Sequence, residues 1–342
     1  MIRVAIVDDS ALVRALLKEI VDERGDMQVV GMAGDPYAAR TVINERNPDV
    51  LTLDVEMPKM NGLDFLDRLM RLRPMPVVMI SSLTHRGAEA ALRALELGAV
   101  DVIAKPQIGI ADGIAALRDE VVEKIRIAAQ SSPRRPLVRA PQNTNAFGSS
   151  DGLVALGAST GGTEAIAEIL RGFSPQAPPT VVVQHMPPVF TKSFAARLNG
   201  SCAVGVREAV DGEPLLSGNA YIAPGDWHLR VERKGRGYVA KLDRSPAVNR
   251  HRPSVDALFL SVAEQAGPNA VGAILTGMGA DGAAGLRSMR AAGAHTIAQD
   301  RESCVVFGMP KAAIALNAAA EVAPLDRIAQ RISESLCAQR KQ

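Results

Sequence analysis

A serine in a glycine-rich turn is the first residue whose surroundings suggest chemistry. Ser159 lies in Gly157-Ala158-Ser159-Thr160-Gly161-Gly162, directly after an apolar run. The G-x-S-x-G spacing permits a sharp turn between a strand and a helix that exposes the serine hydroxyl. A helix beginning near Glu164 would direct its N–H groups and positive dipole end toward that hydroxyl. The pattern therefore suits a nucleophile, although a glycine-rich turn capped by Ser159 would look the same.

A histidine and an aspartate occupy matching positions after other apolar runs. His185 follows residues 180–183, and Asp281 follows residues 271–275 within a glycine-rich stretch. The loops after parallel strands emerge at one edge of a sheet, so Ser159, His185 and Asp281 are expected to meet there. Such a set supplies a nucleophile, a general base and a carboxylate that orients the base. A backbone N–H near Ser159 or Met278 could bind the oxyanion.

Other histidines offer competing assignments. Hydrolases with the order serine, acid, histidine would select Ser159, Asp281 and His295. His295, however, precedes the strand-like residues 296–298, which places it at the opposite end from the catalytic edge. His228 and His251 lie in a polar segment and could line a substrate surface. We therefore prefer His185 as the base.

A second constellation lies near the N-terminus, again at predicted strand ends. Asp8 and Asp9 follow the first strand, Asp54 the third, Ser81 the fourth and Lys105 the fifth. Adjacent carboxylates repel one another unless a cation lies between them, and oxygen ligands suit Mg²⁺. A carboxylate neutralised in this way can accept a phosphoryl group, whose oxygens a lysine and a hydroxyl can then bind.

The elements that must position both constellations alternate along the chain. Strand-like residues 4–7, 28–33, 50–53, 77–80 and 100–103 alternate with helical patterns at 10–24, 35–47, 62–72, 86–97 and 112–128. This alternation predicts an α/β fold with a doubly wound parallel sheet, and the C-terminal half repeats it. Breaker-rich residues between the halves indicate a linker. We expect domains at 1–125 and 151–342, joined by a linker at 126–150.

The composition excludes several classes of protein. A net charge of +2 and the lack of aromatic residues among basic ones argue against nucleic-acid binding. No apolar run is long enough for a membrane span, and the N-terminus enters a strand pattern rather than a signal peptide. Three scattered cysteines suit a reducing compartment. We expect a cytoplasmic protein without membrane insertion.

The N-terminal motifs resemble the receiver domain of bacterial response regulators. They are Val7-Asp8-Asp9-Ser10, Leu53-Asp54-Val55-Glu56-Met57-Pro58, Met60-Asn61-Gly62 and Lys105-Pro106. The resemblance implies a flavodoxin-like fold, phosphorylation of Asp54 by a histidine kinase, and Mg²⁺ bound by Asp8, Asp9, Asp54 and the Glu56 carbonyl. Ser81 and Lys105 would support the phosphoryl group. Val102 stands where receivers commonly have an aromatic switch residue.

The C-terminal half resembles the catalytic domain of chemotaxis protein-glutamate methylesterases, the CheB family. The motifs are residues 157–162, Gln184-His185-Met186, residues 222–225, His251-Arg252-Pro253-Ser254-Val255-Asp256, residues 275–282 and Val306-Phe307-Gly308-Met309-Pro310. The resemblance implies a Rossmann-like domain with Ser159, His185 and Asp281 as its triad, and with Met278 and Thr160 in the oxyanion pocket.

The same resemblance implies a reaction. Glutamate methyl esters on methyl-accepting chemotaxis receptors would be hydrolysed, and selected glutamines deamidated, with no metal in either step. The rival interpretation is a non-enzymatic two-component regulator that binds a phosphorylated ligand at residues 157–162. Against it, this turn lacks the G-K-[ST] of a phosphate loop and the full G-x-G-x-x-G fingerprint.

Overall fold

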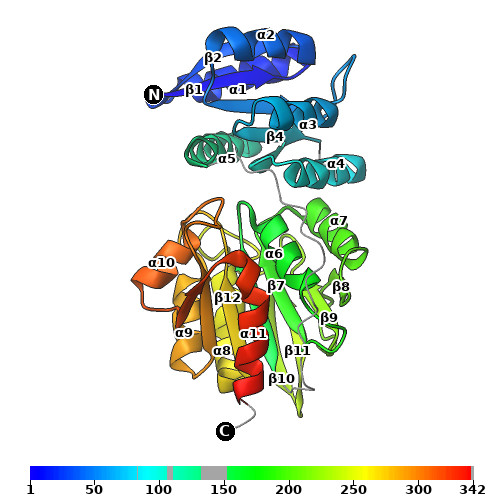
Figure 1. Ribbon diagram of the computed structural model, residues 1–342, viewed down its shortest axis with the longest axis vertical. Coiled ribbons are helices and arrows are strands. Elements are labelled where there is room, and N and C mark those ends of the chain that lie inside the picture. Colours follow the sequence, from blue (N-terminus) through cyan, green and yellow to red (C-terminus); the bar gives the residue numbers. More distant parts are fainter. Residues whose placement is uncertain (83, 106–110, 132–151, 340–342) are drawn as a thin grey trace. The chain divides into compact units, whose positions relative to one another are not determined.

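Two parallel sheets with flanking helices and one antiparallel hairpin make up the described part of the chain (Figure 1). The computed structural model describes residues 1–82, 84–105, 111–131 and 152–339. The chain divides into two compact units, Met1–Leu137 and Val138–Gln342. Most of the expected linker, residues 132–150, lies outside the described residues, so the domain limits drawn from the sequence stay predictions.

The first unit is a five-stranded parallel sheet in the order β2-β1-β3-β4-β5. This is the flavodoxin-like order, which confirms the predicted fold. Its elements are β1 (Ile2–Val7), α1 (Ala11–Asp22), β2 (Met27–Ala33), α2 (Pro36–Arg46), β3 (Val50–Asp54), α3 (Gly62–Leu72), β4 (Val77–Ser81), α4 (His85–Glu96), β5 (Asp101–Ala104) and α5 (Ala111–Gln130).

Side-chain caps fix where the helices of this unit begin. Ser10, Asp35, Asn61 and Thr84 each accept a hydrogen bond from a backbone N–H in the first turn of the following helix. Every residue of β3 and β4 is buried, because helices cover both faces of the sheet. The polar side chains at the carboxyl ends of these strands are thereby held on a rigid frame.

The second unit contains a seven-stranded parallel sheet in the order β14-β13-β12-β6-β7-β9-β8 and a separate antiparallel hairpin, β10-β11. The doubly wound sheet confirms the predicted fold. The elements are β6 (Leu153–Ala158), α6 (Gly162–Arg171), β7 (Thr180–Gln184), α7 (Pro188–Asn199), β8 (Gly205–Glu208), β9 (Asn219–Ile222), β10 (His228–Lys234), β11 (Gly237–Asp243), α8 (Val255–Gln265), η1 (Gly267–Asn269), β12 (Ala270–Ile274), α9 (Ala283–Ala291), β13 (His295–Gln299), α10 (Met309–Ala315), β14 (Glu321–Ala323) and α11 (Leu325–Gln339).

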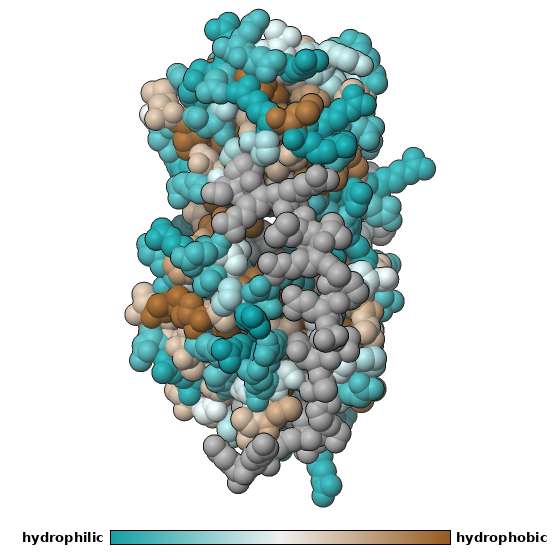
Figure 2. All heavy atoms as spheres, in the orientation of Figure 1, coloured by the Kyte–Doolittle hydropathy of each residue, from teal (hydrophilic) through white to brown (hydrophobic). Residues whose placement is uncertain are grey.

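The central strands β6, β7 and β12 of this sheet are buried at every residue. Aliphatic side chains fill most of the core, and the largest fully buried aromatic side chains are Tyr221, Phe173, Phe194 and Phe259. Figure 2 shows a largely hydrophilic surface with hydrophobic side chains scattered on it. Ile314 in α10 and Leu316 directly after it are among the exposed large apolar residues. Isolated exposed apolar side chains are ordinary for a folded domain. None of the described helices combines the length and apolar character needed to cross a bilayer.

Candidate active site

The register of the central strands brings Ser159 and His185 together. Strands β6 and β7 pair in parallel, with Ala158 opposite Gln184. Ser159 directly follows β6 and His185 directly follows β7, and neighbouring strands lie about 4.8 Å apart. Gln184 ties the two loops, since its Nε2 donates to the Ser159 carbonyl at 2.8 Å and to the His185 carbonyl at 3.3 Å. The prediction that these residues share one sheet edge is therefore met.

His185 and Asp281 are in direct contact. His185 Nε2 lies 2.8 Å from Asp281 Oδ2, with 8% of the histidine side chain and 1% of the aspartate side chain exposed. Since the carboxylate accepts from Nε2–H, the ring is left with Nδ1 as its acceptor nitrogen. Within the described residues, Nδ1 is buried without a hydrogen-bond partner. It is therefore the nitrogen available to a serine hydroxyl.

The Asp281 carboxylate sits in a dense set of donors. Oδ1 accepts from Asn249 Nδ2 at 2.7 Å and Ser254 Oγ at 2.8 Å, and Oδ2 also accepts from the Val255 N–H at 2.7 Å. Ser254 is the N-cap of α8, so the carboxylate lies at the positive end of that helix. Burial raises the pKa of Asp281, but the hydrogen bonds from His185, Asn249 and Ser254 outweigh it and hold this pKa well below its ordinary value. Asp281 is thus an anion at neutral pH.

The turn that carries Ser159 is shaped by glycines. Gly161 precedes α6 with φ +76°, a conformation that other residues rarely adopt, and a Cβ there would meet Val305 at 2.7 Å. Gly277 approaches so closely that a Cβ would lie 2.7 Å from Ser159 Cβ. Met278, the expected oxyanion donor, follows directly and is exposed. Thr160 is buried, and its carbonyl accepts from Thr276 Oγ1 at 3.0 Å.

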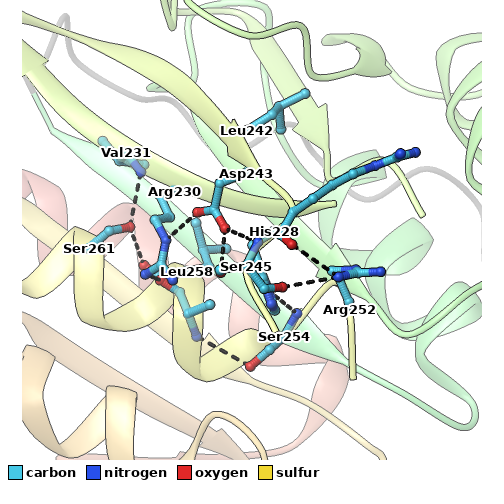
Figure 3. A network of polar contacts seen from close by, with 12 residues as sticks. His228, Arg230, Val231, Leu242, Asp243, Ser245, Arg252, Ser254, Leu258 and Ser261 are labelled. Carbon is cyan, nitrogen blue, oxygen red and sulfur yellow. Dashed lines mark hydrogen bonds and ion pairs between the residues drawn. The ribbon is translucent and has the colours of Figure 1, made fainter. Parts of the chain in front are cut away.

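The remaining histidines occupy different settings. His295 begins β13 at the opposite end of the sheet and lies 3.3 Å from Glu321, so the competing base is remote from Ser159. His228 is fully buried, and its Nδ1 accepts from the Ser254 N–H at 3.2 Å (Figure 3). Its Nε2 donates to the Pro246 carbonyl, also at 3.2 Å. It therefore supports the chain around Ser254 and cannot line a substrate surface.

His251 stacks on His185. The two ring centroids are 3.7 Å apart, with 9° between the ring planes. One ligand atom from each of His185, His251 and Asp281 lies within 4.8 Å of the others, which raises the question of a metal site. Imidazole lone pairs lie in the ring plane, and bound metals sit about 2 Å from the nitrogen. Parallel stacked rings cannot both direct lone pairs at one ion, so the geometry does not fit a metal centre.

Sequence reasoning missed the contacts made by Asn249 and Ser254. Asn249 Nδ2 donates to both Asp281 and Asp256, each at 2.7 Å. Ser254 stands before the apolar helix Val255–Gln265, which is an N-cap signature that predicts a helix start. The N-cap signature predicts that a helix begins after Ser254, but no local sequence pattern shows that this helix end lies against Asp281.

The acidic cluster of the first unit also assembles as predicted. One carboxylate oxygen from each of Asp8, Asp9 and Asp54 lies within 4.8 Å of the others. Lys105 Nζ lies 2.7 Å from Asp54 Oδ2 and 3.4 Å from Asp8 Oδ2. Asp8 and Asp54 are buried, whereas Asp9 is exposed. Burial raises the pKa of Asp54 to about 6 despite the bond from Lys105, and burial also raises the pKa of Asp8.

The other residues expected around this cluster are placed as follows. Ser81 is buried, and its hydroxyl donates to the Gly87 carbonyl in α4 at 2.9 Å. The Glu56 N–H donates to Asp54 Oδ1 at 3.3 Å. Val102 packs against the hydrophobic core, and its carbonyl accepts from Lys124. The structure thus brings Asp8, Asp9, Asp54 and Lys105 together, whereas the Ser81 hydroxyl is hydrogen-bonded to α4.

Comparisons with known proteins match both halves of the chain. The CheB methylesterase family model matches residues 154–332, and the response regulator receiver domain model matches residues 4–118. A protein of Paraburkholderia xenovorans (strain LB400), named protein-glutamate methylesterase/protein-glutamine glutaminase, is 56% identical over 98% of this chain and 96% of its own length. A protein of Escherichia coli (strain K12) with the same name is 56% identical over 98% of this chain and 97% of its own.

One solved structure supports the fold of the second half. The CheB methylesterase catalytic domain of Thermotoga maritima has a TM-score of 0.52 and 42% identity, covering 54% of this chain and 97% of that domain.

Proposed function

The chain belongs to the CheB methylesterase family, in the form that carries a receiver domain, and we propose that it is a phosphorylation-regulated protein-glutamate methylesterase and protein-glutamine glutaminase. The observation that carries the proposal is the hydrogen bond between His185 and Asp281. These residues follow β7 and β12, the two strands that pair with β6, which ends just before Ser159. No described contact favours the rival, a phosphorylated-ligand site at residues 157–162.

The proposed hydrolysis uses the hydrogen bonds already described. Ser159 Oγ attacks the ester carbonyl and gives its proton to His185 Nδ1, while Asp281 stabilises the imidazolium through Nε2–H. The protonated ring then donates to the departing methoxide, releasing methanol and leaving an acyl-serine. Water then attacks the acyl-serine with His185 again as base, the bond to Ser159 Oγ breaks, and the imidazolium returns the proton to Ser159 Oγ, which leaves a glutamate side chain on the receptor. A glutamine side chain follows the same path with ammonia as the leaving group.

The oxyanion of each tetrahedral intermediate needs donors beside Ser159. We assign this role to the Met278 backbone N–H, because Gly277 brings that loop against Ser159, and we place Thr160 in the same pocket. The N-terminus of α6 lies directly after Ser159 and adds a favourable dipole. Removal of one such donor typically costs about 10²–10³ in kcat.

The receiver half supplies the regulation, and we propose Asp54 as its phosphoacceptor. Lys105 would bind the phosphoryl oxygens, since it already contacts Asp54 and Asp8. Asp8, Asp9, Asp54 and the Glu56 carbonyl would hold Mg²⁺. The donor set fits a hard cation, because three carboxylate oxygens converge within 4.8 Å. Asp8 Oδ2 is buried and makes no hydrogen bond among the described residues, and its one ion pair, to Lys105, is 3.4 Å long. When bound, Mg²⁺ neutralises the clustered negative charge and attracts the phosphoryl oxygens.

The partners follow from the two activities. We propose methylated chemotaxis receptors as substrates and a chemotaxis histidine kinase as phosphodonor, both acting in the cytoplasm, as the family resemblance implies. The test is methanol release from methylated receptor by the full chain, with and without a small-molecule phosphodonor. Methanol should appear, and the phosphodonor should accelerate its release. No methanol in either case, with the protein folded, would refute the methylesterase assignment.

A further inference from the structure

The turn at residues 248–251 places the side chains of Asn249 and His251 against the pair His185 and Asp281. Val248 and His251 exchange both backbone hydrogen bonds, at 3.1 and 2.9 Å, which closes a two-residue turn. Both central residues, Asn249 and Arg250, have positive φ angles of 52° and 66°. Such conformations are costly for residues other than glycine, and they persist where the surrounding structure fixes them.

Hydrogen bonds anchor this turn at each end. Asn249 is fixed to Asp281 and Asp256. Arg252 donates to the carbonyl of Ser245 at 3.1 Å (Figure 3). It also donates to the carbonyl of Arg244 at 3.2 Å and forms an ion pair with Asp226. The His251 ring therefore stands on a rigid support rather than on a free loop.

The contact between the two rings is made by faces and not by polar atoms. The ring centroids are 3.7 Å apart, and His251 Nδ1 is buried without a hydrogen-bond partner in the described part of the chain. Burial, together with the neighbouring His185, lowers the pKa of His251 to about 4. His251 is therefore neutral where the enzyme works, and a neutral aromatic face attracts an adjacent cation such as a His185 imidazolium.

We propose that His251 is a positioning residue, whose ring covers one face of His185 and fixes the plane in which Nδ1 meets Ser159. Asp281 restrains His185 at a single nitrogen, so the imidazole could still rotate about that hydrogen bond. The stacked ring removes this freedom and keeps water from that face. The inference rests on the proposed role of His185 as general base.

The test compares three variants of the full chain in methanol release, with phosphodonor present. His251→Ala should lower kcat about 10- to 100-fold with KM little changed, since a misoriented catalytic group costs up to about 10² in rate. His251→Phe retains a stacking face and should restore kcat to within about threefold of wild type. Arg250→Gly is the matched control, because Arg250 is exposed on the same turn and glycine accepts its φ; its rate should equal that of wild type.

Nitrogen-15 spectra of the imidazole rings give a readout independent of turnover. In wild type and His251→Phe, one tautomer of His185 should dominate, with Nε2 protonated. In His251→Ala, Nε2 should stay protonated by its bond to Asp281, but the His185 ring signals should broaden, because the ring then samples more than one plane. Wild-type kcat together with unbroadened His185 signals in folded His251→Ala would overturn the inference. So would a folded His251→Phe as slow as His251→Ala.

The two proposals fail in distinguishable ways. A wild type that releases no methanol refutes the proposed function, and the spectra then still decide whether His251 orders His185. An active wild type with insensitive His251 variants refutes only the inference. Thermal unfolding of each variant identifies any that does not fold.

Discussion

Replacing Asp281 by asparagine should separate the electrostatic role of this residue from its shape. Every group that faces the two carboxylate oxygens donates a hydrogen bond. Oδ1 accepts from Asn249, Ser254 and the Asp256 N–H, and Oδ2 accepts from His185 and the Val255 N–H. An amide nitrogen in either position would therefore face at least one donor. The better arrangement directs it at His185 Nε2, which moves the ring proton to Nδ1.

That tautomer cannot accept the Ser159 proton, so kcat should fall by about 10⁴, the size of effect known for the equivalent change in other triads. The Val255 N–H also loses its acceptor, and an unsatisfied buried donor costs about 1–3 kcal/mol. Folding stability should fall by that amount, with the native fold kept. Methanol release and urea unfolding measure the two effects.

Asp300→Asn is the matched control. Asp300 follows β13 on the neighbouring strand, and its Oδ1 accepts from Ser303, a contact that an asparagine oxygen can retain. Its activity should stay near that of wild type, as is usual for changes outside such networks. Asp281→Asn with more than a tenth of wild-type activity would refute the assigned tautomer and with it the role of Nδ1.

Further predictions concern the triad, the phosphoacceptor, pH and regulation. Ser159→Ala and His185→Ala should each nearly abolish methanol release, and the double variant should be little worse than either, because the residues act as a unit. Asp54→Asn should take up no label from a phosphodonor, and chelation of Mg²⁺ should block labelling of the wild type. The pKa of His251 is about 4 in the folded protein and about 6.5 in the unfolded chain. Between pH 6.5 and pH 4 only the unfolded chain therefore binds this proton. The free energy of unfolding should fall as the pH drops from 7 to 5, by about 2 kcal/mol at most. Because phenylalanine does not titrate, the free energy of unfolding of His251→Phe, measured with urea, should not show this decrease between pH 7 and 5. We also propose, from the family resemblance, that the unphosphorylated receiver restrains the catalytic half. A fragment spanning residues 148–342 should then exceed the intact unphosphorylated chain in methanol release, and it should not respond to the phosphodonor because it lacks Asp54. A fragment no more active than the intact chain would refute this restraint.

The position of polar residues at strand ends explains why the clustering of these side chains can be predicted from the sequence. Apolar runs ending at Asp8, Asp54, Ser159 and His185 identify buried parallel strands, and parallel pairing places those ends together. This prediction depends only on element order, which local patterns reveal.

Other parts of the site depend on contacts between distant segments. Asn249 and His251 reach the catalytic pair through a turn whose central residues, Asn249 and Arg250, have positive φ angles. Asn249 is a common turn residue, but Arg250 stands where glycine usually follows it, so the turn signal is weak. The hairpin β10-β11 was likewise not predicted, because its strands are partly exposed and lack a continuous apolar run. Ser81 follows the expected strand, but its bond to Gly87 depends on how α4 begins.

The most direct test of the central claim is mass spectrometry of the full chain after treatment with a serine-directed phosphonate, with methanol release followed in parallel. The account predicts one modified residue, Ser159, and a loss of activity proportional to its modification. It also predicts little labelling in His185→Ala, where the hydroxyl lacks its base. Modification of another residue, or full methanol release from protein fully labelled at Ser159, would contradict the assignment of Ser159 as the nucleophile.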